Sequence, residues 1–158
     1  MTYQTCQWTR EVSGRKQYAD WWKCKFVFVY GTLKLGRGSN LGTFWGANDG
    51  GTQYMQITRT MERGRTVKEF GLWGANAGFP FMTTDSPQTV RVRGEVYQIP
   101  FNVFRSCDNL EGYPVMYDRS IIQVQLDTGD IVDAWAYHQD HDAAYLWEGP
   151  RFVASGNW

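Results

Sequence analysis

The chain has 158 residues, and its 16 Lys and Arg balance 16 Asp and Glu, so the formal net charge is zero. This length suits one domain and is sufficient to bury a hydrophobic core. A neutral chain lacks the basic face on which nucleic-acid binding through counterion release depends. It also lacks an apolar run of about 18 residues, the length of a transmembrane helix. We therefore expect neither a nucleic-acid nor a membrane partner.

The N-terminal segment, residues 1–24, is polar and contains no apolar stretch of the kind found in secretory signal peptides. The chain has three cysteines, Cys6, Cys24 and Cys107, whose spacing matches neither a disulfide framework nor a zinc site. A reducing, cytoplasmic location is therefore predicted. We expect an N-terminal extension over residues 1–24, as a strand, a short helix or a partner-binding arm, and one domain over residues 25–158.

Aromatic residues make up 16% of the chain and glycine occurs 17 times, which favours a compact, strand-rich fold with tight turns. The strongest predicted strand is Lys25–Tyr30, an apolar run that we expect to be buried on both faces. A glycine-rich loop follows it over residues 31–38. Residues 40–49 fit a short helix weakened by its glycines.

The central part of the chain predicts more strands. Residues 59–73 have strand character interrupted by Gly64 and Gly71, and residues 74–81 form a turn rich in Gly and Ala. Residues 89–97 alternate apolar and polar side chains, which predicts a half-exposed strand.

The C-terminal part begins with an amphipathic helix over residues 101–110, with Asn102 as its N-cap and Gly112 at its C-terminal end. Residues 120–127 and 131–137 alternate and are joined by Asp-Thr-Gly-Asp, which predicts a hairpin. The tail from residue 138 is polar with scattered aromatics. Together the elements amount to five or six strands and two short helices, an α+β fold.

Two segments could carry chemistry. The glycine-rich loop after the strand ending at Tyr30 could present backbone N–H groups to an anion or oxyanion, although the spacing alone favours an ordinary turn. Asp108 and Glu111 stand three residues apart at the end of the predicted helix, where acids oppose the helix dipole. They are either functional or simply solvated.

Other patterns favour no site. The segment His138–Asp142 has the residue types of a metal site, but no further ligand follows at a suitable spacing, and we expect its histidines to be solvent-exposed. No Gly-x-Ser-x-Gly elbow or Ser-His-Asp arrangement is indicated. Cys107 lies on the apolar side of the predicted helix and is expected in the core.

Seven short motifs occur in a fixed order along the chain: Phe28–Lys34, Gly78–Pro80, Val92–Tyr97, Asp108–Pro114, Tyr117–Arg119, Ala134–Tyr137 and Ser155–Trp158. Each motif is weak alone, but the ordered set is specific. Over about residues 26–158 it resembles the gamma-glutamylcyclotransferase-like family, also called AIG2-like.

The resemblance implies an α+β fold in which a mixed, twisted sheet closes into a partial β-barrel with two or so short flanking helices. It also implies a cofactor-free and metal-free reaction, of transferase or lyase type, that converts a γ-glutamyl amine or peptide into 5-oxoproline and a free amine or amino acid. By this resemblance Glu111 is the general acid/base. The loop residues Tyr30, Gly31, Thr32 and Leu33 bind the glutamyl group, and Tyr117 and Tyr137 lie near the substrate.

The sequence departs from the family pattern at two places. Many relatives have a histidine where this chain has Leu41, and Cys107 replaces the leucine that opens the Asp-x-Leu-Glu motif. These changes leave the released amine open. One alternative is a small-ligand or partner-binding module that reuses the same pocket, and another is a lyase or transferase acting on a γ-glutamylated carrier. The oligomeric state is also left open.

Overall fold

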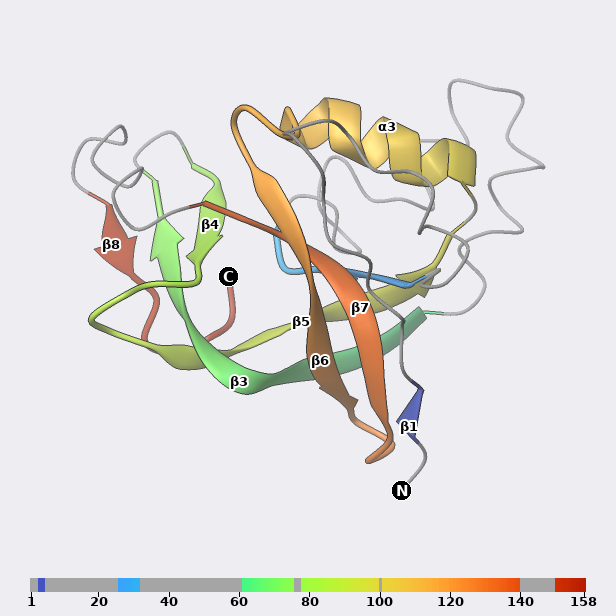
Figure 1. Ribbon diagram of the computed structural model, residues 1–158. Coiled ribbons are helices and arrows are strands. Elements are labelled where there is room, and N and C mark those ends of the chain that lie inside the picture. The colour runs from blue at the N-terminus through green and yellow to red at the C-terminus, as the bar shows by residue number, and fades with distance from the viewer. Residues whose placement is uncertain (1–2, 5–25, 32–60, 76–77, 100, 140–149) are drawn as a thin grey trace.

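The computed structural model describes residues 3–4, 26–31, 61–75, 78–99, 101–139 and 150–158. In these ranges the chain forms eight strands and one helix (Figure 1). In chain order they are β1 (Tyr3–Gln4), β2 (Phe26–Val29), β3 (Met61–Gly74), β4 (Pro80–Thr83), β5 (Val90–Gln98), α3 (Phe101–Glu111), β6 (Asp118–Leu126), β7 (Ile131–His138) and β8 (Arg151–Phe152).

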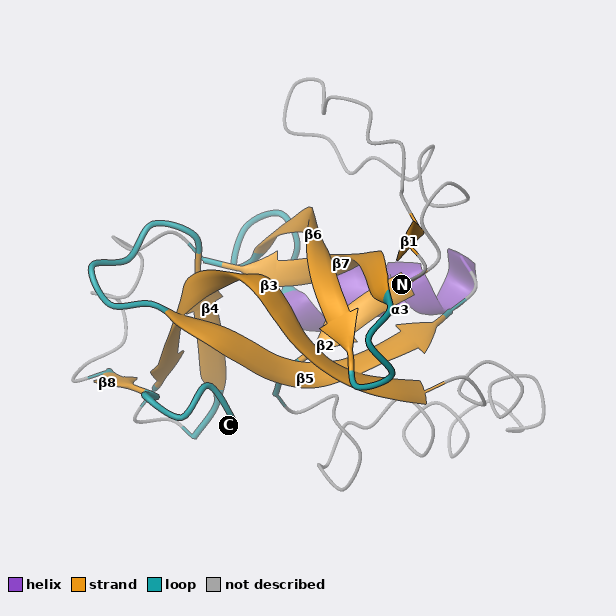
Figure 2. Cartoon of the chain, turned by 90° about the horizontal axis from the view of Figure 1, so that it is seen from below, coloured by secondary structure: helices purple, strands orange, loops and turns teal. Residues whose placement is uncertain are grey.

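Five strands close into a barrel, in the order β2, β5, β3, β6, β7 and back to β2. All of these pairs are antiparallel except β2 with β7, so the sheet is mixed, as predicted. Strand β1 adds in parallel to β7, while β4 and β8 pair with the C-terminal part of β3. Figure 2 shows α3 lying across the barrel on the side away from the viewer.

Strand β2 contributes to two hydrophobic cores, because its side chains alternate between its two faces. Phe28 joins a core to which α3 contributes no residue, here called the strand-side core, which includes Val92 and Val96 of β5. Val27 and Val29 join a second core that includes the helix residues of α3. The prediction that this strand is buried on both faces is confirmed.

Strand β3 is continuous through both glycines that the sequence suggested as interruptions. A Cβ on Gly64 would lie 2.5 Å from the Gln125 carbonyl oxygen, and one on Gly71 would lie 2.2 Å from the Thr83 hydroxyl. These glycines therefore permit close approach of neighbouring chain segments rather than breaking the strand.

Strand β3 does carry a bulge, where the register shifts between Arg65 and Glu69. The buried Thr66 hydroxyl fills the gap in the ladder: it donates to the Lys68 carbonyl oxygen at 2.6 Å and accepts from the Val92 N–H at 2.9 Å. The side chain thus satisfies backbone groups that the irregular pairing leaves out.

The predictions for one strand and one turn were wrong in part. Strand β5 is not half-exposed, because Gly94, Glu95, Val96 and Tyr97 are all buried. The strand-side core covers one face of the strand, and the core that contains α3 residues, here called the helix-side core, covers the other. The predicted turn over residues 74–81 is shorter. Its hydrogen bonds span Ala75 to Phe79, and β4 begins at Pro80.

The predicted helix is confirmed, but it begins at Phe101, so Asn102 lies inside it and is not the N-cap. Its C-terminal end agrees with the prediction. Gly112 has φ +67°, its N–H donates to the Asn109 carbonyl at 3.3 Å, and the Tyr113 N–H donates to the Asp108 carbonyl at 2.9 Å. This bonding is a Schellman motif, which glycine favours.

The predicted hairpin is also confirmed, with β6 and β7 slightly longer than expected and Gly129 at φ +99° in the turn. The tail contributes β8, which the sequence did not predict. The helix expected over residues 40–49 lies outside the described residues, as does all of the extension except β1. In the part of the chain that is described, α3 is too short and too polar to cross a membrane.

The bulge interpretation predicts that Thr66→Val destabilises the protein. The substitution keeps the shape but removes both hydrogen bonds from a buried site, which costs about 1–3 kcal/mol. The melting temperature, followed by circular dichroism, should fall by several degrees. The exposed Thr84→Val is the matched control, and equal melting temperatures of the two variants would contradict this account.

Candidate active site

A cavity of about 230 Å³ opens where the ends of β2, α3 and β7 meet the residues that begin β4 and β6. Its walls are mostly aromatic and aliphatic. The lining residues are Phe28, Val29, Tyr30, Gly31, Phe79, Pro80, Leu110, Glu111, Met116, Tyr117 and Tyr137.

Glu111 is the last residue of α3, immediately before the Schellman glycine. Its side chain is half-buried in the cavity wall, and burial raises its pKa to about 7, because the charged form loses hydration. Near neutral pH the protonated and ionised forms are therefore present in comparable amounts. A carboxyl group in that state can both accept and return a proton.

Tyr30 directly follows β2, and its hydroxyl connects this end of β2 to β7 and β4. Its hydroxyl donates to the Tyr137 carbonyl oxygen of β7 at 2.6 Å and accepts from the Met82 N–H of β4 at 3.0 Å. Burial raises its pKa well above the usual value, so the hydroxyl stays neutral. The next residue, Gly31, lies so close to Pro80 that a Cβ would sit 2.7 Å from the proline Cγ.

Tyr117 lies on the wall formed by the segment before β6. It is buried, and its hydroxyl donates to the Pro80 carbonyl oxygen at 3.2 Å. Burial is the main cause that raises its pKa above the usual value, and the neighbouring Glu111 carboxyl adds to the effect. Tyr117 thus lies in the site as a neutral phenol, close enough to Glu111 for the carboxylate charge to raise its pKa.

Beneath the cavity lies a buried network that the sequence analysis missed. Asp108 is fully buried, and its two carboxylate oxygens accept from Arg119 Nε at 3.0 Å and Nη2 at 3.3 Å. The Tyr137 hydroxyl donates to the same carboxylate at 2.6 Å. Tyr137 therefore lines the cavity with its hydroxyl already bonded to Asp108.

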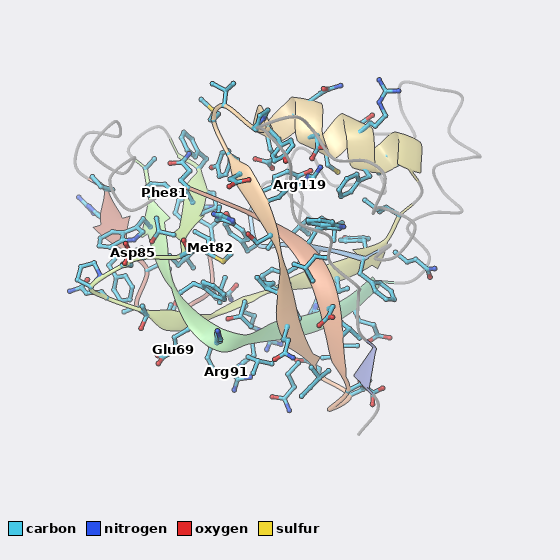
Figure 3. All side chains as sticks on the ribbon, in the orientation of Figure 1. Glu69, Phe81, Met82, Asp85, Arg91 and Arg119 are labelled. Atoms are coloured by element: carbon cyan, nitrogen blue, oxygen red, sulfur yellow. The ribbon has the colours of Figure 1, made fainter. Side chains whose placement is uncertain are left out.

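Aromatic rings surround the charged partner of Asp108. The Arg119 guanidinium lies 4.1 Å from the Tyr113 ring centroid, 4.7 Å from that of Phe104 and 4.6 Å from that of Trp135. Figure 3 shows Arg119 under α3, on the barrel side of the helix. Cation–π contacts of this kind stabilise a desolvated guanidinium. The network thereby fixes the helix turn from which Glu111 projects.

Five of the predicted site residues line this one cavity: Tyr30, Gly31, Glu111, Tyr117 and Tyr137. The other two, Thr32 and Leu33, lie outside the described residues. The sequence analysis did not single out the apolar lining of Phe28, Val29, Phe79, Leu110 and Met116. Phe28, Val29, Phe79 and Leu110 did stand inside motifs that carried the resemblance, whereas Met116 did not.

The prediction that His138 is solvent-exposed was wrong. It is buried at the end of β7, where its Nε2 lies 2.8 Å from the Ser120 Oγ, whereas His141 lies outside the described residues. The described ranges contain no group of three or more potential metal ligands. Cys107 is buried in the helix-side core, as predicted, and burial raises its thiol pKa.

The fold and the cavity define a small β-barrel protein in which a half-buried carboxyl group, Glu111 at the end of a helix, lines a mostly apolar cavity. Residues 27–158 match the family model described as gamma-glutamyl cyclotransferase, AIG2-like, and the chain belongs to this family. It is an enzyme of the gamma-glutamyl cyclotransferase type.

Individual relatives agree with this assignment. The chain is 30% identical over 116 residues to gamma-glutamylaminecyclotransferase A of Danio rerio, covering 72% of this chain and 68% of the relative. It is 31% identical over 119 residues to the Mus musculus gamma-glutamylaminecyclotransferase, covering 70% and 75%. The crystal structure of a Mus musculus AIG2-like protein superposes with a TM-score of 0.61 at 27% identity, covering 81% of this chain and 84% of that one.

The buried network predicts that Arg119→Met is strongly destabilising. Removal of the guanidinium leaves Asp108 buried without its ion-pair partner, which costs about 3–5 kcal/mol. Urea unfolding should show this loss, and the double variant Arg119→Met with Asp108→Asn should recover part of it, because no buried charge remains. A double variant whose loss equals the sum of the two single losses would contradict the coupling.

The raised pKa of Glu111 predicts that Glu111→Gln stabilises the protein at high pH. The folded state binds the Glu111 proton more tightly than the unfolded state, whose pKa is near 4.5. Stability therefore falls as pH rises from about 4.5 to 7, and the loss is complete above 7. Gln lacks this loss, so the variant should gain up to about 3 kcal/mol at pH 8 and little at pH 4. A constant difference across pH would contradict the raised pKa.

Proposed function

We propose that this chain is a cofactor-free gamma-glutamyl cyclotransferase in which Glu111 is the general acid/base and the products are 5-oxoproline and a free amine or amino acid. The observation that carries the proposal is the Glu111 carboxyl, with its pKa of about 7, in the wall of a small and mostly apolar cavity. The family membership supplies the reaction class.

The reaction is an intramolecular acyl transfer. The Glu111 carboxylate takes a proton from the substrate α-amine, whose nitrogen then attacks the γ-carbonyl carbon and forms the new C–N bond. The tetrahedral oxyanion collapses and expels the leaving nitrogen, which receives the proton from Glu111. The ring nitrogen then loses its surplus proton to the regenerated Glu111 carboxylate, which passes it to the released amine, so the amine leaves as an ammonium ion. Atoms and charges balance without a metal or cofactor. One carboxyl that performs both transfers contributes about 10²–10⁴-fold in rate.

The cavity has features that suit ring closure. Its 230 Å³ lies below the roughly 300–1,000 Å³ of sites for drug-sized ligands, so it suits a group as small as a glutamyl moiety. Holding that group in one folded conformer supplies much of the catalysis in an intramolecular reaction. We further propose that backbone N–H groups of Gly31, Thr32 and Leu33 bind the glutamyl oxygens and the oxyanion, the role that the family resemblance gives to these residues.

The decisive experiment compares the unchanged protein with Glu111→Gln on a panel of γ-glutamyl amines and dipeptides, with 5-oxoproline measured by mass spectrometry. We expect kcat to fall by about 10²–10⁴-fold while the fold is retained. The pH profile of kcat/KM in the unchanged protein should show a limb near 7, set by Glu111. Glu62→Gln is the matched control, because Glu62 is exposed on β3 and does not line the cavity.

Two outcomes would contradict the proposal. Turnover by Glu111→Gln equal to that of the unchanged protein would exclude Glu111 as the acid/base. A well-folded protein that forms no 5-oxoproline from any substrate, and that releases an intact small ligand on denaturation, would indicate a binding module instead.

A further inference from the structure

The side chains that line the cavity differ in how much of their surface is exposed to solvent. Tyr137 is 4% exposed to solvent, and Tyr30 and Tyr117 are 6% exposed each, so these three residues form the closed end of the cavity. Leu110 is 44% exposed and Met116 is 52% exposed, so these two residues form the mouth of the cavity. In the sequence, Leu110 precedes Glu111 and Met116 follows it.

The position of Glu111 assigns the two halves of the substrate to the two ends. In the proposed reaction the carboxyl serves both the attacking and the leaving nitrogen, so the scissile bond lies next to it. The cavity volume suits the glutamyl half alone, at the closed end. The substituent on the leaving nitrogen must then extend toward the mouth, across Leu110 and Met116.

We infer that the amine released by this enzyme carries an apolar substituent, such as an alkyl or aryl chain, which packs on Leu110 and Met116 at the cavity mouth. This inference rests on the proposed function. Among the described lining residues, Glu111 is the sole side chain with a formal charge, so they include no partner for a second charge on the substituent. A cationic substituent that lies along the same aliphatic surface loses hydration without a compensating ion pair there.

The test uses two substrates of equal length, γ-glutamyl-n-hexylamide and γ-glutamyl-5-aminopentylamide, which differ at the far end by a methyl group against an amino group that is protonated at neutral pH. We expect kcat/KM for 5-oxoproline release to be roughly three- to tenfold higher for the hexylamide. Lengthening the alkyl chain by one methylene should raise kcat/KM further, by about two- to fourfold, until the chain passes Met116.

Two variants locate the effect. Met116→Glu places a carboxylate at the mouth and should move the preference toward the aminopentylamide by about tenfold. Val115→Glu is the matched control, because Val115 is 95% exposed on the same turn and does not line the cavity, so its carboxylate is screened by water. The ratio of the two kcat/KM values cancels any effect of the new charge on the chemistry at Glu111.

The outcomes separate this inference from the proposed function. Equal turnover of the two amides, or faster turnover of the charged one, by the unchanged protein overturns the apolar preference and leaves the cyclotransferase reaction intact. An equal shift in Val115→Glu and Met116→Glu overturns the assignment of the mouth. Absence of 5-oxoproline from both amides and from the whole γ-glutamyl panel overturns the proposed function, and the inference with it.

Discussion

The ion pair between Asp108 and Arg119 joins the helix to the barrel, and the geometry of the site depends on it. Asp108 belongs to the last turn of α3 and Arg119 to β6, and both side chains are almost completely buried. A bidentate pair fixes orientation as well as distance. Because Tyr137 of β7 bonds to the same carboxylate, one group sets the position of the helix end against two barrel strands.

The same ion pair also gives the two acids at the end of α3, Asp108 and Glu111, different electrostatic surroundings. Asp108 and Glu111 are one helix turn apart, at the end of the helix where the dipole disfavours negative charge. Arg119 balances the Asp108 charge directly, so Asp108 serves as a structural anion. For Glu111, the cause of the raised pKa is burial, and no cationic partner contributes to it. The two carboxyls of one helix thus have different surroundings, which supports proposing different roles for them.

Local patterns were sufficient to predict the parts of the fold that local chemistry determines. The hairpin of β6 and β7, the helix and its glycine end follow from residue spacing and turn chemistry. Burial depends on what covers a strand, so β5 was predicted as half-exposed and His138 as exposed. The site shows the same division. Glu111 could be found through its motif, whereas the partner of Asp108 stands eleven residues away and is brought to it only by the turn between α3 and β6.

The parallel pairing of β2 and β7 explains why the site residues meet. Parallel strands end at the same edge of a sheet, so Tyr30 at the end of β2 and Tyr137 near the end of β7 reach one rim of the barrel. Strand β6 is antiparallel to β7 and therefore begins at that rim, beside Tyr117. The helix precedes β6, so its C-terminal end and Glu111 arrive at the same place. An antiparallel β2 would place Tyr30 at the opposite end of the barrel, and no cavity could then contain both Tyr30 and Glu111.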